Sequence, residues 1–438
     1  MTQGGGAVRL LRSAPGRLEL RRRYTNRLWP ALAYVARAYR RTVIRRVRVV
    51  AVIGSAGKTT TMRTASAALA RPVRRQAMLN VGSHAGAGRA LFSVRPRDRH
   101  AVVEAAIGGK GEMHKLARTI RPDVVIVTAI ARDHWQSFGT LEVTRDEKAN
   151  MLRPLSPTAT VVANADDPHV RWMTTQTRAR VILAGEAADA LIRATDVQLD
   201  WPHGMRFNVE VDGLVRPAST RMVGRHMVFG ALAAIAVGYL EGVPLDEAIR
   251  RVAAVEPTPG RMQAMALARG GHALRDDFKG SIDAFNAALA TLVEIPAARR
   301  VAVIGEIVEE TGQQDYRDVG AKAAFMDRIV FVGSRKHYQA FRLGAKSGGM
   351  PAEHIERVAN AHAAIDVLRD QVGPGDVLFI KGRWQQALGR VGLALAGRDV
   401  QCRADPCPFK RMLCDTCPFL EQPFTGLANR QEGGRSSA

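Results

Sequence analysis

The sequence predicts an α/β fold, with a larger parallel-sheet domain followed by a smaller Rossmann-like α/β domain. Short runs of β-branched residues alternate with helix-like stretches along most of the 438 residues, as in parallel sheets whose strands are joined by crossover helices. A glycine-rich turn follows the first of these runs directly, at residues 54–57. The alternation stops at a linker rich in proline and glycine, residues 256–262, and then resumes, which indicates a second domain.

Four segments are expected along the chain. A basic N-terminal segment, residues 1–46, precedes the first domain at 47–255, and the second domain at 256–399 precedes a cysteine-rich tail at 400–438 whose end is expected to be disordered. The strands of the two domains are expected at "RVVAVIG", "HAVVEAA", "DVVIVTAI", "TATVVANA", "RRVAVIGEI", "DRIVFVG" and "GDVLFIKG". Residues 180–219 break the alternation and are expected to form an antiparallel insertion.

The chain is strongly basic, with 64 Lys and Arg against 41 Asp and Glu, a formal net charge of +23. This charge suits anionic substrates, an acidic membrane surface or nucleic acid, and it is also compatible with a solvated basic surface. Leu28, Leu32, Val35 and Ala36 predict an amphipathic helix with an arginine-rich face. Such a helix could lie on an anionic membrane as a peripheral contact or pack on its own domain.

The location expected from the sequence is the cytoplasm. The first 17 residues lack the apolar core of a signal peptide, and no apolar run reaches the roughly 18 residues of a membrane span. All four cysteines lie in the tail, which is unlike the disulfide framework of a secreted protein.

The glycine-rich turn "GSAGKTT" has the residues of a phosphate-binding loop and makes the first domain a P-loop-type ATPase domain. Gly54 and Gly57 let the backbone turn tightly and direct its N–H groups inward. Lys58 can then meet the β- and γ-phosphates, while Thr59, followed by Thr60, can hold Mg²⁺ at a helix N-terminus that favours anions. The loop is a shortened variant, because Val52 stands where the common spacing has a glycine.

Three further residues are candidates for chemistry at the same edge of the sheet. Glu104 and His134 each follow a predicted parallel strand, and the carboxyl ends of such strands form the ligand-binding edge of open α/β sheets. A carboxylate and an imidazole there could hold Mg²⁺, and Lys148 follows shortly after. Each residue also has a purely structural interpretation. Glu104 could cap a helix, His134 could be a histidine whose hydrogen bonds are all made within the protein, and Lys148 could be an ordinary surface lysine.

Taken together, these motifs resemble the Mur ligase family over residues 47–398. The matching pieces stand in the family's order: "GSAGKTT", "NVG", "EAAIGGKGEM", "TAIARDHWQSFGT", "EKA", "NADDP", "GRHMVFGALAA", "PGRM", "DDFKGSIDAF" and "FIKG". Each piece alone is a weak signal, whereas the ordered set is a specific one. The resemblance covers the family's central and C-terminal domains, and it points to the D-Ala-D-Ala-adding and cyanophycin synthetase-like branches.

The resemblance implies an ATP-dependent ligase that joins a carboxylate to an amine, expected to be an amino acid, through an acyl phosphate, releasing ADP and phosphate. Lys58 and Thr59 would bind the ATP phosphates and Mg²⁺, Glu104 and His134 would serve the metal sites, and Lys148 matches a lysine that many members carbamylate. Arg261 and Asp277 would contact ATP from the second domain. The expected partners are these two small-molecule substrates, with no nucleic acid.

Some features depart from the family's pattern and keep alternatives open. Met227 and Gly230 stand where the family commonly has asparagines, one of which often contacts adenine, so nucleotide affinity is expected to differ. Residues 1–46 are too few for the domain that binds a UDP-sugar precursor, which argues against a standard UDP-linked step. The alternatives are a catalytically silent, ligase-like binding module and a nucleic-acid-dependent P-loop NTPase; the latter lacks any nucleic-acid-reading motif.

The tail spaces its cysteines as C-x4-C-x6-C-x2-C. Four thiols at Cys402, Cys407, Cys414 and Cys417 suit tetrahedral Zn²⁺ or an iron–sulfur cluster, with a structural or partner-docking role. Reduced thiols without a metal and disulfides are the alternatives.

Overall fold

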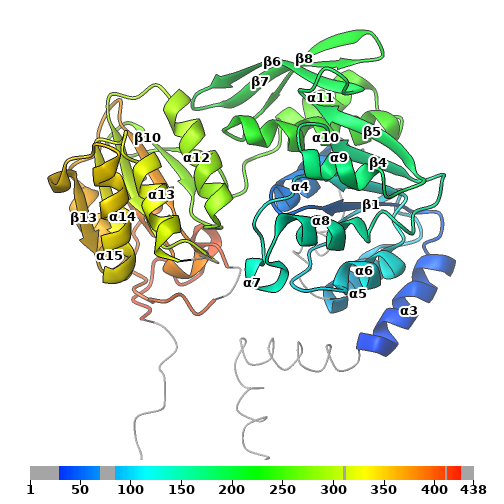
Figure 1. Cartoon of the computed structure of the whole chain (residues 1–438), viewed down its shortest axis with the longest axis horizontal. Coiled ribbons are helices and arrows are strands. Elements are labelled where there is room, and N and C mark those ends of the chain that lie inside the picture. The colour runs from blue at the N-terminus through cyan, green and yellow to red at the C-terminus, as the bar shows by residue number, and fades with distance from the viewer. Residues whose placement is uncertain (1–28, 70–83, 309–311, 410–411, 426–438) are drawn as a thin grey trace, which may run out of the picture. The chain divides into compact units, whose positions relative to one another are not determined.

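The computed structural model describes residues 29–69, 84–308, 312–409 and 412–425 (Figure 1). The chain divides into two compact units. The first holds the described parts of Met1–Asp196 with Phe207–Ser219 and Phe229–Val255, and the second holds Val197–Arg206, Thr220–Val228 and the described parts of Glu256–Ala438. The division into four segments stays a prediction. Most of the basic N-terminal segment and the end of the tail, expected to be disordered, lie outside the described residues.

The first unit holds most of an eight-stranded sheet in the order β2-β1-β3-β4-β5-β6-β7-β8, whose residues within Val197–Arg206 and at Thr220 belong to the second unit. Its strands are β1 (Arg48–Ile53), β2 (His100–Glu104), β3 (Val124–Val127), β4 (Thr160–Asn164), β5 (Arg180–Gly185), β6 (Ile192–Asp200), β7 (Gly204–Val211) and β8 (Leu214–Thr220). Pairing is parallel from β2 through β1, β3, β4 and β5 to β6. Nearly every residue of β1, β2 and β3 is buried, as expected for parallel strands covered on both faces.

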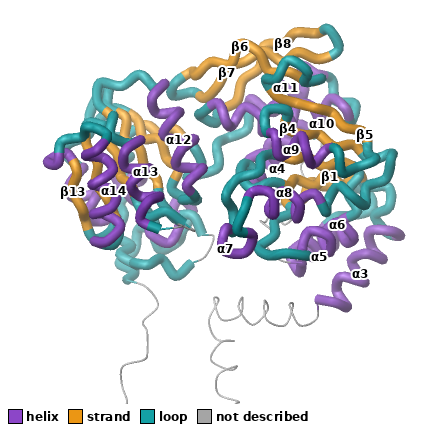
Figure 2. Tube along the Cα trace, viewed as in Figure 1, coloured by secondary structure: helices purple, strands orange, loops and turns teal. Residues whose placement is uncertain are grey.

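The expected insertion at 180–219 begins later than the sequence suggests. β5 pairs in parallel with β4 and so continues the main sheet. The irregular part consists of β6, β7 and β8, which follow one another in the chain and in the sheet through short turns (Figure 2). The break in hydrophobic rhythm therefore marks half-exposed strands rather than a separate subdomain.

Helices cover the first sheet and enclose its apolar core. They are α3 (Trp29–Thr42), α4 (Lys58–Ala68), α5 (His84–Ser93), α6 (Glu112–Ile120), α7 (Trp135–Phe138), α8 (Leu141–Ala149), α9 (Pro168–Thr174), α10 (Val228–Leu240) and α11 (Leu245–Ala253). One large core cluster joins β1, β2, β3 and β4 to α5, α6 and α9. The loops at the carboxyl ends of these strands are thereby held on a rigid support.

The helix predicted in the basic N-terminal segment is α3. It packs against α5 and α6 of its own unit, in agreement with the second of the two interpretations that the sequence allows. Its buried side carries Ala33, Ala36 and Arg40, whereas Val35, which the sequence places on the apolar face, is 52% exposed. Among the described helices, none is both long and apolar enough to cross a membrane.

The second unit is a Rossmann-like layer structure around a six-stranded sheet in the order β13-β12-β11-β14-β10-β9. Its strands are β9 (Gln263–Ala266), β10 (His272–Asp276), β11 (Arg300–Ile304), β12 (Arg328–Val332), β13 (Ile355–Val358) and β14 (Val377–Lys381). The edge strand β9 is antiparallel, and the other pairs are parallel. The predicted α/β class with two parallel-dominated sheets is confirmed.

Alternate residues of these strands face two separate apolar cores. Ala302, Ile304 and Phe331 belong to one cluster, which α12 (Ile282–Glu294), α13 (Gln313–Lys322) and α14 (Arg335–Ser347) cover. Val301 and Val303 belong to the other cluster, which α15 (Ala361–Leu368) and α16 (Gly389–Leu395) cover. The period-two alternation of side chains along each strand produces this three-layer arrangement.

The described part of the cysteine-rich tail packs within the second unit. Cys402, Ala404 and Leu420 are almost fully buried, and the backbone N–H of Cys402 donates to Leu420 O at 2.9 Å. Phe409, Phe419 and Phe424 stack on one another, with ring centroids 4.7 to 5.5 Å apart. The described tail residues, 400–409 and 412–425, are therefore a packed part of this unit.

Candidate active site

The turn after β1 has the geometry of a phosphate-binding loop. Gly54 has φ 136° and Gly57 has φ 76°, and α4 begins immediately afterwards. A β-carbon at Gly54 would lie 2.0 Å from Thr128 Oγ1, so only glycine fits there. Thr128 Oγ1 donates to Ala56 O at 2.6 Å and ties the loop to the strand beside it.

Two ammonium groups meet at this loop. Lys58 Nζ donates to Gly54 O at 2.8 Å and to Ser55 O at 3.0 Å, and Lys148 Nζ reaches the same Gly54 carbonyl at 3.0 Å. Both lysines are buried, and Lys148 extends from α8, more than 90 residues further along the chain. The structure thus concentrates positive charge where a nucleotide's phosphates would lie.

Thr59 and Glu104 form the part of the site that fits Mg²⁺. Thr59 Oγ1 donates to Glu104 Oε2 at 2.8 Å, and Glu104 is fully buried. Among the described residues, Glu104 Oε1 has no hydrogen-bond partner. A buried carboxylate oxygen without a partner is costly, and a hydroxyl beside a carboxylate is a donor set that Mg²⁺ prefers.

Mg²⁺ would draw most of its other ligands from outside the protein. In the described part of the chain, no three His, Cys, Asp or Glu side chains converge closely enough to hold a metal ion by themselves. Magnesium sites of this kind keep several waters and use substrate phosphates as ligands. Thr59 and Glu104 are therefore matched to a metal that arrives with a nucleotide.

His134 lies at the rim of the site and is joined to Lys58 through Asp133. His134 has a left-handed backbone with φ 54° and is the N-cap residue directly before α7, and its Nε2 lies 3.9 Å from Asp133 Oδ1. The buried Asp133 has its other oxygen 3.7 Å from Lys58 Nζ. Asp133 is not among the residues expected from the sequence, although an acid directly before His134, in the loop after a predicted strand, was a usable signal.

The two departures at 227 and 230 have packing explanations. A β-carbon at Gly230 would lie 2.9 Å from Thr61 Oγ1, and Gly230 O accepts from Thr64 Oγ1 at 3.2 Å, so α10 approaches α4 closely here. Thr60, also on α4, is buried. Met227 belongs to an apolar core cluster of the second unit. Their expected effect on nucleotide affinity stays a prediction.

In the second unit, Asp277 lies in a buried ion-pair network with the tail. Arg275 Nε donates to Asp277 Oδ1 at 3.1 Å, while its Nη1 and Nη2 donate to the two oxygens of Asp415 at 2.7 and 3.1 Å. Arg275 is 1% exposed. Burial alone would lower the pKa of Arg275, but Asp277 and Asp415 outweigh it and raise the pKa. Arg261 lies over the Phe278 ring, its guanidinium carbon 4.4 Å from the centroid.

A second missed residue, Lys381, shapes the loop that carries Asp277. Lys381 ends β14 opposite Asp276 of β10, and its buried Nζ donates to Asp276 Oδ2 and to Lys279 O, both at 2.6 Å. Burial lowers the pKa of Lys381, and Asp276 opposes that shift. The sequence contained this lysine in "FIKG", but its partners depend on strand order, which the motif does not reveal.

The four tail cysteines are free thiols in the structure. Cys402 Sγ accepts from Arg390 Nη2 at 3.2 Å. Burial raises the pKa of Cys407, and it raises the pKa of Cys414 to about 12. Among the described residues, which include all four cysteines, no three Cys, His, Asp or Glu side chains converge on one metal position, so the arrangement of the thiols does not by itself support zinc or an iron–sulfur cluster.

Comparison with known families decides the assignment. The model of the Mur ligase middle domain matches residues 52–238, and the model of the Mur ligase glutamate ligase domain matches residues 260–384, together well over half of the chain. The chain belongs to the Mur ligase family. It is therefore an ATP-dependent enzyme of the amide-forming ligase class.

Individual relatives agree with this assignment. The chain is 28% identical to UDP-N-acetylmuramoyl-tripeptide--D-alanyl-D-alanine ligase of Mycobacterium tuberculosis (strain ATCC 25618 / H37Rv) over 80% of this chain and 73% of the relative. It is also 28% identical to the enzyme of that name from Escherichia coli (strain K12), over 76% and 75% of the two chains.

Solved structures show the same fold. MurF from Acinetobacter baumannii has a TM-score of 0.74 at 20% identity, covering 84% of this chain and 81% of that one. Mycobacterium tuberculosis folylpolyglutamate synthase, complexed with ADP, has a TM-score of 0.62 at 20% identity, covering 85% and 94%.

Proposed function

We propose that this Mur ligase activates a carboxylate substrate with ATP and joins it to an amine. A carboxylate oxygen attacks the γ-phosphorus of ATP, the bond from that phosphorus to the β–γ bridging oxygen breaks, and ADP leaves. The amine nitrogen then attacks the acyl carbon of the acyl phosphate and loses a proton, and inorganic phosphate leaves. Little of this chemistry needs a covalent contribution from the protein, so charge placement is the main requirement.

The observation that carries this proposal is the charge arrangement around the loop 54–57. Lys58 and Lys148 direct two ammonium groups to one loop carbonyl, where they would stabilise charge on the transferred phosphoryl group. Thr59 and the half-paired Glu104 would hold Mg²⁺, which neutralises phosphate charge when bound. Asp133 would orient Lys58, and His134 would act at the rim.

The remaining assignments of site residues are proposals of the same kind. Gly54, Gly57 and Thr60 would contact the phosphates through the loop and the first turn of α4. Arg261 and Asp277 are proposed nucleotide contacts of the second unit. Carbamylation of Lys148 would replace its ammonium group with a carboxylate-like metal ligand, and Lys58 and Mg²⁺ alone would then meet the charge on the phosphates.

The amine is proposed to be an amino acid or a short peptide. Two of the relatives above are named UDP-N-acetylmuramoyl-tripeptide--D-alanyl-D-alanine ligases, which makes the dipeptide D-alanyl-D-alanine the first amine to test. The acyl donor is proposed to be a small molecule with a free carboxylate. ATP is a cytoplasmic substrate, so the proposed location is the cytoplasm.

The test is to trap the acyl phosphate. Purified protein is incubated with ATP, Mg²⁺, pooled carboxylates and hydroxylamine, and hydroxamates are identified by mass. We expect a hydroxamate from the wild type and none from Lys58→Ala or Lys148→Ala, while Lys346→Ala, which changes an exposed lysine on α14, behaves as wild type. A hydroxamate that persists in Lys58→Ala would contradict the proposal, as would ATP hydrolysis that requires a polynucleotide.

The cysteine-rich tail is proposed to bind zinc or an iron–sulfur cluster and to contact a partner protein. Supporting this, Cys402, Cys407, Cys414 and Cys417 are all free and fall within one 16-residue stretch. Elemental analysis of the purified chain tests it: about one zinc per chain is expected, and none after all four are changed to serine.

A further inference from the structure

A basic pocket of about 980 Å³ lies in the first unit, away from the phosphate-binding loop. α3, the end of α6 with the turn that follows it, and residues 151–156 form its walls. Its volume is within the range of sites for small molecules. Six arginines line it: Arg37, Arg40, Arg41, Arg45, Arg118 and Arg121.

The pocket is at the opposite end of the sheet from the nucleotide. Asp123 in its wall accepts from the backbone N–H of Val49, near the start of β1, whereas Gly54 follows the end of β1. Six residues at about 3.3 Å each separate the two sites by roughly 20 Å. A ligand here is therefore not the ATP of the proposed reaction, and the inference does not rest on the proposed function.

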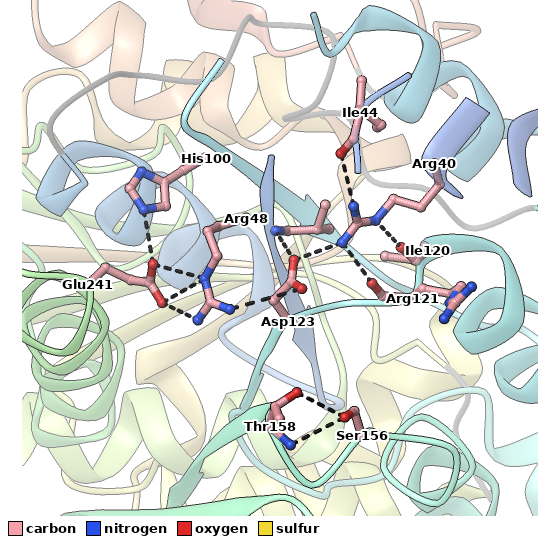
Figure 3. A network of polar contacts seen from close by, with 11 residues as sticks. Arg40, Ile44, Arg48, His100, Ile120, Arg121, Asp123, Ser156, Thr158 and Glu241 are labelled. Carbon is pink, nitrogen blue, oxygen red and sulfur yellow. Dashed lines mark hydrogen bonds and ion pairs between the residues drawn. The ribbon is translucent and has the colours of Figure 1, made fainter. Parts of the chain in front are cut away.

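One wall of the pocket is fixed by a buried arginine (Figure 3). Arg40 is 6% exposed and donates to the carbonyl oxygens of Ile44, Ile120 and Arg121 at 3.0 to 3.2 Å. Its Nη2 also donates to Asp123 Oδ2 at 2.7 Å. These hydrogen bonds fix α3 against the segment 120–123 that precedes β3. The exposed arginines of α3 are therefore held in position beside that segment.

The positive charge of the pocket exceeds what its own acid can neutralise. Asp123 is the single acidic residue in the described lining, and Arg40 and the Val49 N–H already use it. Burial lowers the pKa of Arg40, and Arg121 adds to that shift although Asp123 opposes it, which shows that the positive groups act on one another.

Four guanidinium groups are available to a ligand. Within the described residues, no hydrogen bond or ion pair occupies the side chains of Arg41, Arg45, Arg118 or Arg121, and all four are exposed. Arg37 and Arg41 lie one turn apart on α3 and so share one side of the helix, and Arg45, in the turn after α3, also lines the pocket. The lining contains arginine and no lysine, and the planar guanidinium fork suits the paired oxygens of phosphate.

We propose that this pocket binds a multiply charged phosphate-bearing anion, either a phospholipid headgroup or a free polyphosphate. Such an anion would neutralise several guanidinium groups at once and relieve their mutual repulsion. A compact pocket fits one or two phosphate groups better than the extended backbone of a nucleic acid, whose readers track many phosphates along a groove.

The experiment measures phosphate binding by full-length protein in a Lys58→Ala background, which weakens the phosphate-binding loop as a competing site. Inorganic pyrophosphate is titrated by calorimetry, and cosedimentation is measured with vesicles of phosphatidylglycerol in phosphatidylcholine and of phosphatidylcholine alone. The pocket variant is Arg41→Gln/Arg45→Gln/Arg118→Gln. The control is Arg317→Gln/Lys346→Gln/Arg369→Gln, which removes equal charge from exposed positions of the second unit. Arg40 is left intact because it is buried.

We expect binding by the parent and the control and a large loss in the pocket variant. For vesicles the loss should be about 100-fold, since each arginine near an anionic surface contributes about fivefold. For pyrophosphate it should be at least about tenfold, as expected for lost charge-assisted hydrogen bonds. A loss confined to vesicles identifies a lipid headgroup, and a loss confined to pyrophosphate identifies a soluble ligand. No binding by the parent, or an equal loss in the control, would overturn the proposal.

Discussion

At the scale of single residues, the two carboxylate oxygens of Glu104 differ. Its Oε2 accepts a hydrogen bond from Thr59 Oγ1, whereas its Oε1 has no partner among the described residues. Glu104→Gln keeps an acceptor for Thr59 Oγ1 and removes the charge of the oxygen that lacks a partner. We expect the variant without nucleotide to be as stable as wild type or more stable by about 1 kcal/mol, because a desolvated charge is lost. Its Mg²⁺-dependent hydroxamate formation should fall at least about 100-fold. Thermal unfolding and a Mg²⁺ titration of activity measure the two effects.

Glu147 provides the matched control for Glu104. It is also buried in the first unit, but both of its oxygens accept backbone N–H groups, from Gly111 and Met113 at 2.9 Å. Glu147→Gln should therefore lose about 1–3 kcal/mol of stability. If Glu104→Gln lost as much, Glu104 would be a structural residue and its assignment to Mg²⁺ would be wrong.

Arg275 tests whether the tail stabilises the candidate nucleotide contact Asp277. Arg275→Met leaves the buried Asp277 and the partly buried Asp415 without their shared cation, so the free energy of unfolding should fall by about 3–5 kcal/mol. Adding Asp415→Asn removes one of the two stranded charges and should restore part of that loss. Urea unfolding of the single and double variants measures it. Strictly additive losses would mean that Arg275 and Asp415 do not interact in solution.

At the scale of elements, one carboxylate joins the end of α10 to the first two strands (Figure 3). Glu241 follows α10 and accepts from Arg48 of β1 and pairs with His100 of β2. Burial alone would raise the pKa of Glu241, but the hydrogen bonds from His100 and Arg48 outweigh it and hold the pKa at about 2, against an ordinary value of 4.5. Because the folded-state pKa is the lower one, this stabilisation is complete above pH 4.5 and is lost as the pH falls towards 2.

The expected size of this effect is about 3 kcal/mol, from about 1.4 kcal/mol per pKa unit. Wild-type stability should fall between pH 4.5 and 2, and the fall should be smaller by that amount in Glu241→Gln, which is already less stable at neutral pH. Denaturant unfolding at a series of pH values gives both curves. If the free energy of unfolding fell equally with pH in both proteins, the pKa of Glu241 would be the same in the folded and unfolded states, and the prediction would be wrong.

At the scale of the whole molecule, the sequence predicts elements well and long-range pairing poorly. Buried parallel strands are continuous apolar runs, and a phosphate-binding loop is a short local motif. Both could therefore be recognised in the sequence alone. Asp133 reaches Lys58 because β3 lies beside β1, and Asp415 reaches Arg275 across 140 residues. Neither contact produces a periodic pattern in the sequence from which it could have been predicted. Val35 was misplaced for a related reason, since helical spacing alone does not say which side of α3 meets α5 and α6.

Ligand binding should couple the phosphate-binding loop to the stability of the folded chain as a whole. A nucleotide that binds the folded state at 100 times its Kd adds about 2.7 kcal/mol to the free energy of unfolding. We expect ATP with Mg²⁺ to raise the unfolding temperature of wild type. Lys58→Ala should lose this response, because it removes an ammonium group that lies at Gly54 O. Lys115→Ala, an exposed change on α6, should keep the response in full. Since the measurement needs no carboxylate or amine, a missing response in wild type would count against nucleotide binding itself, whichever substrates the enzyme joins.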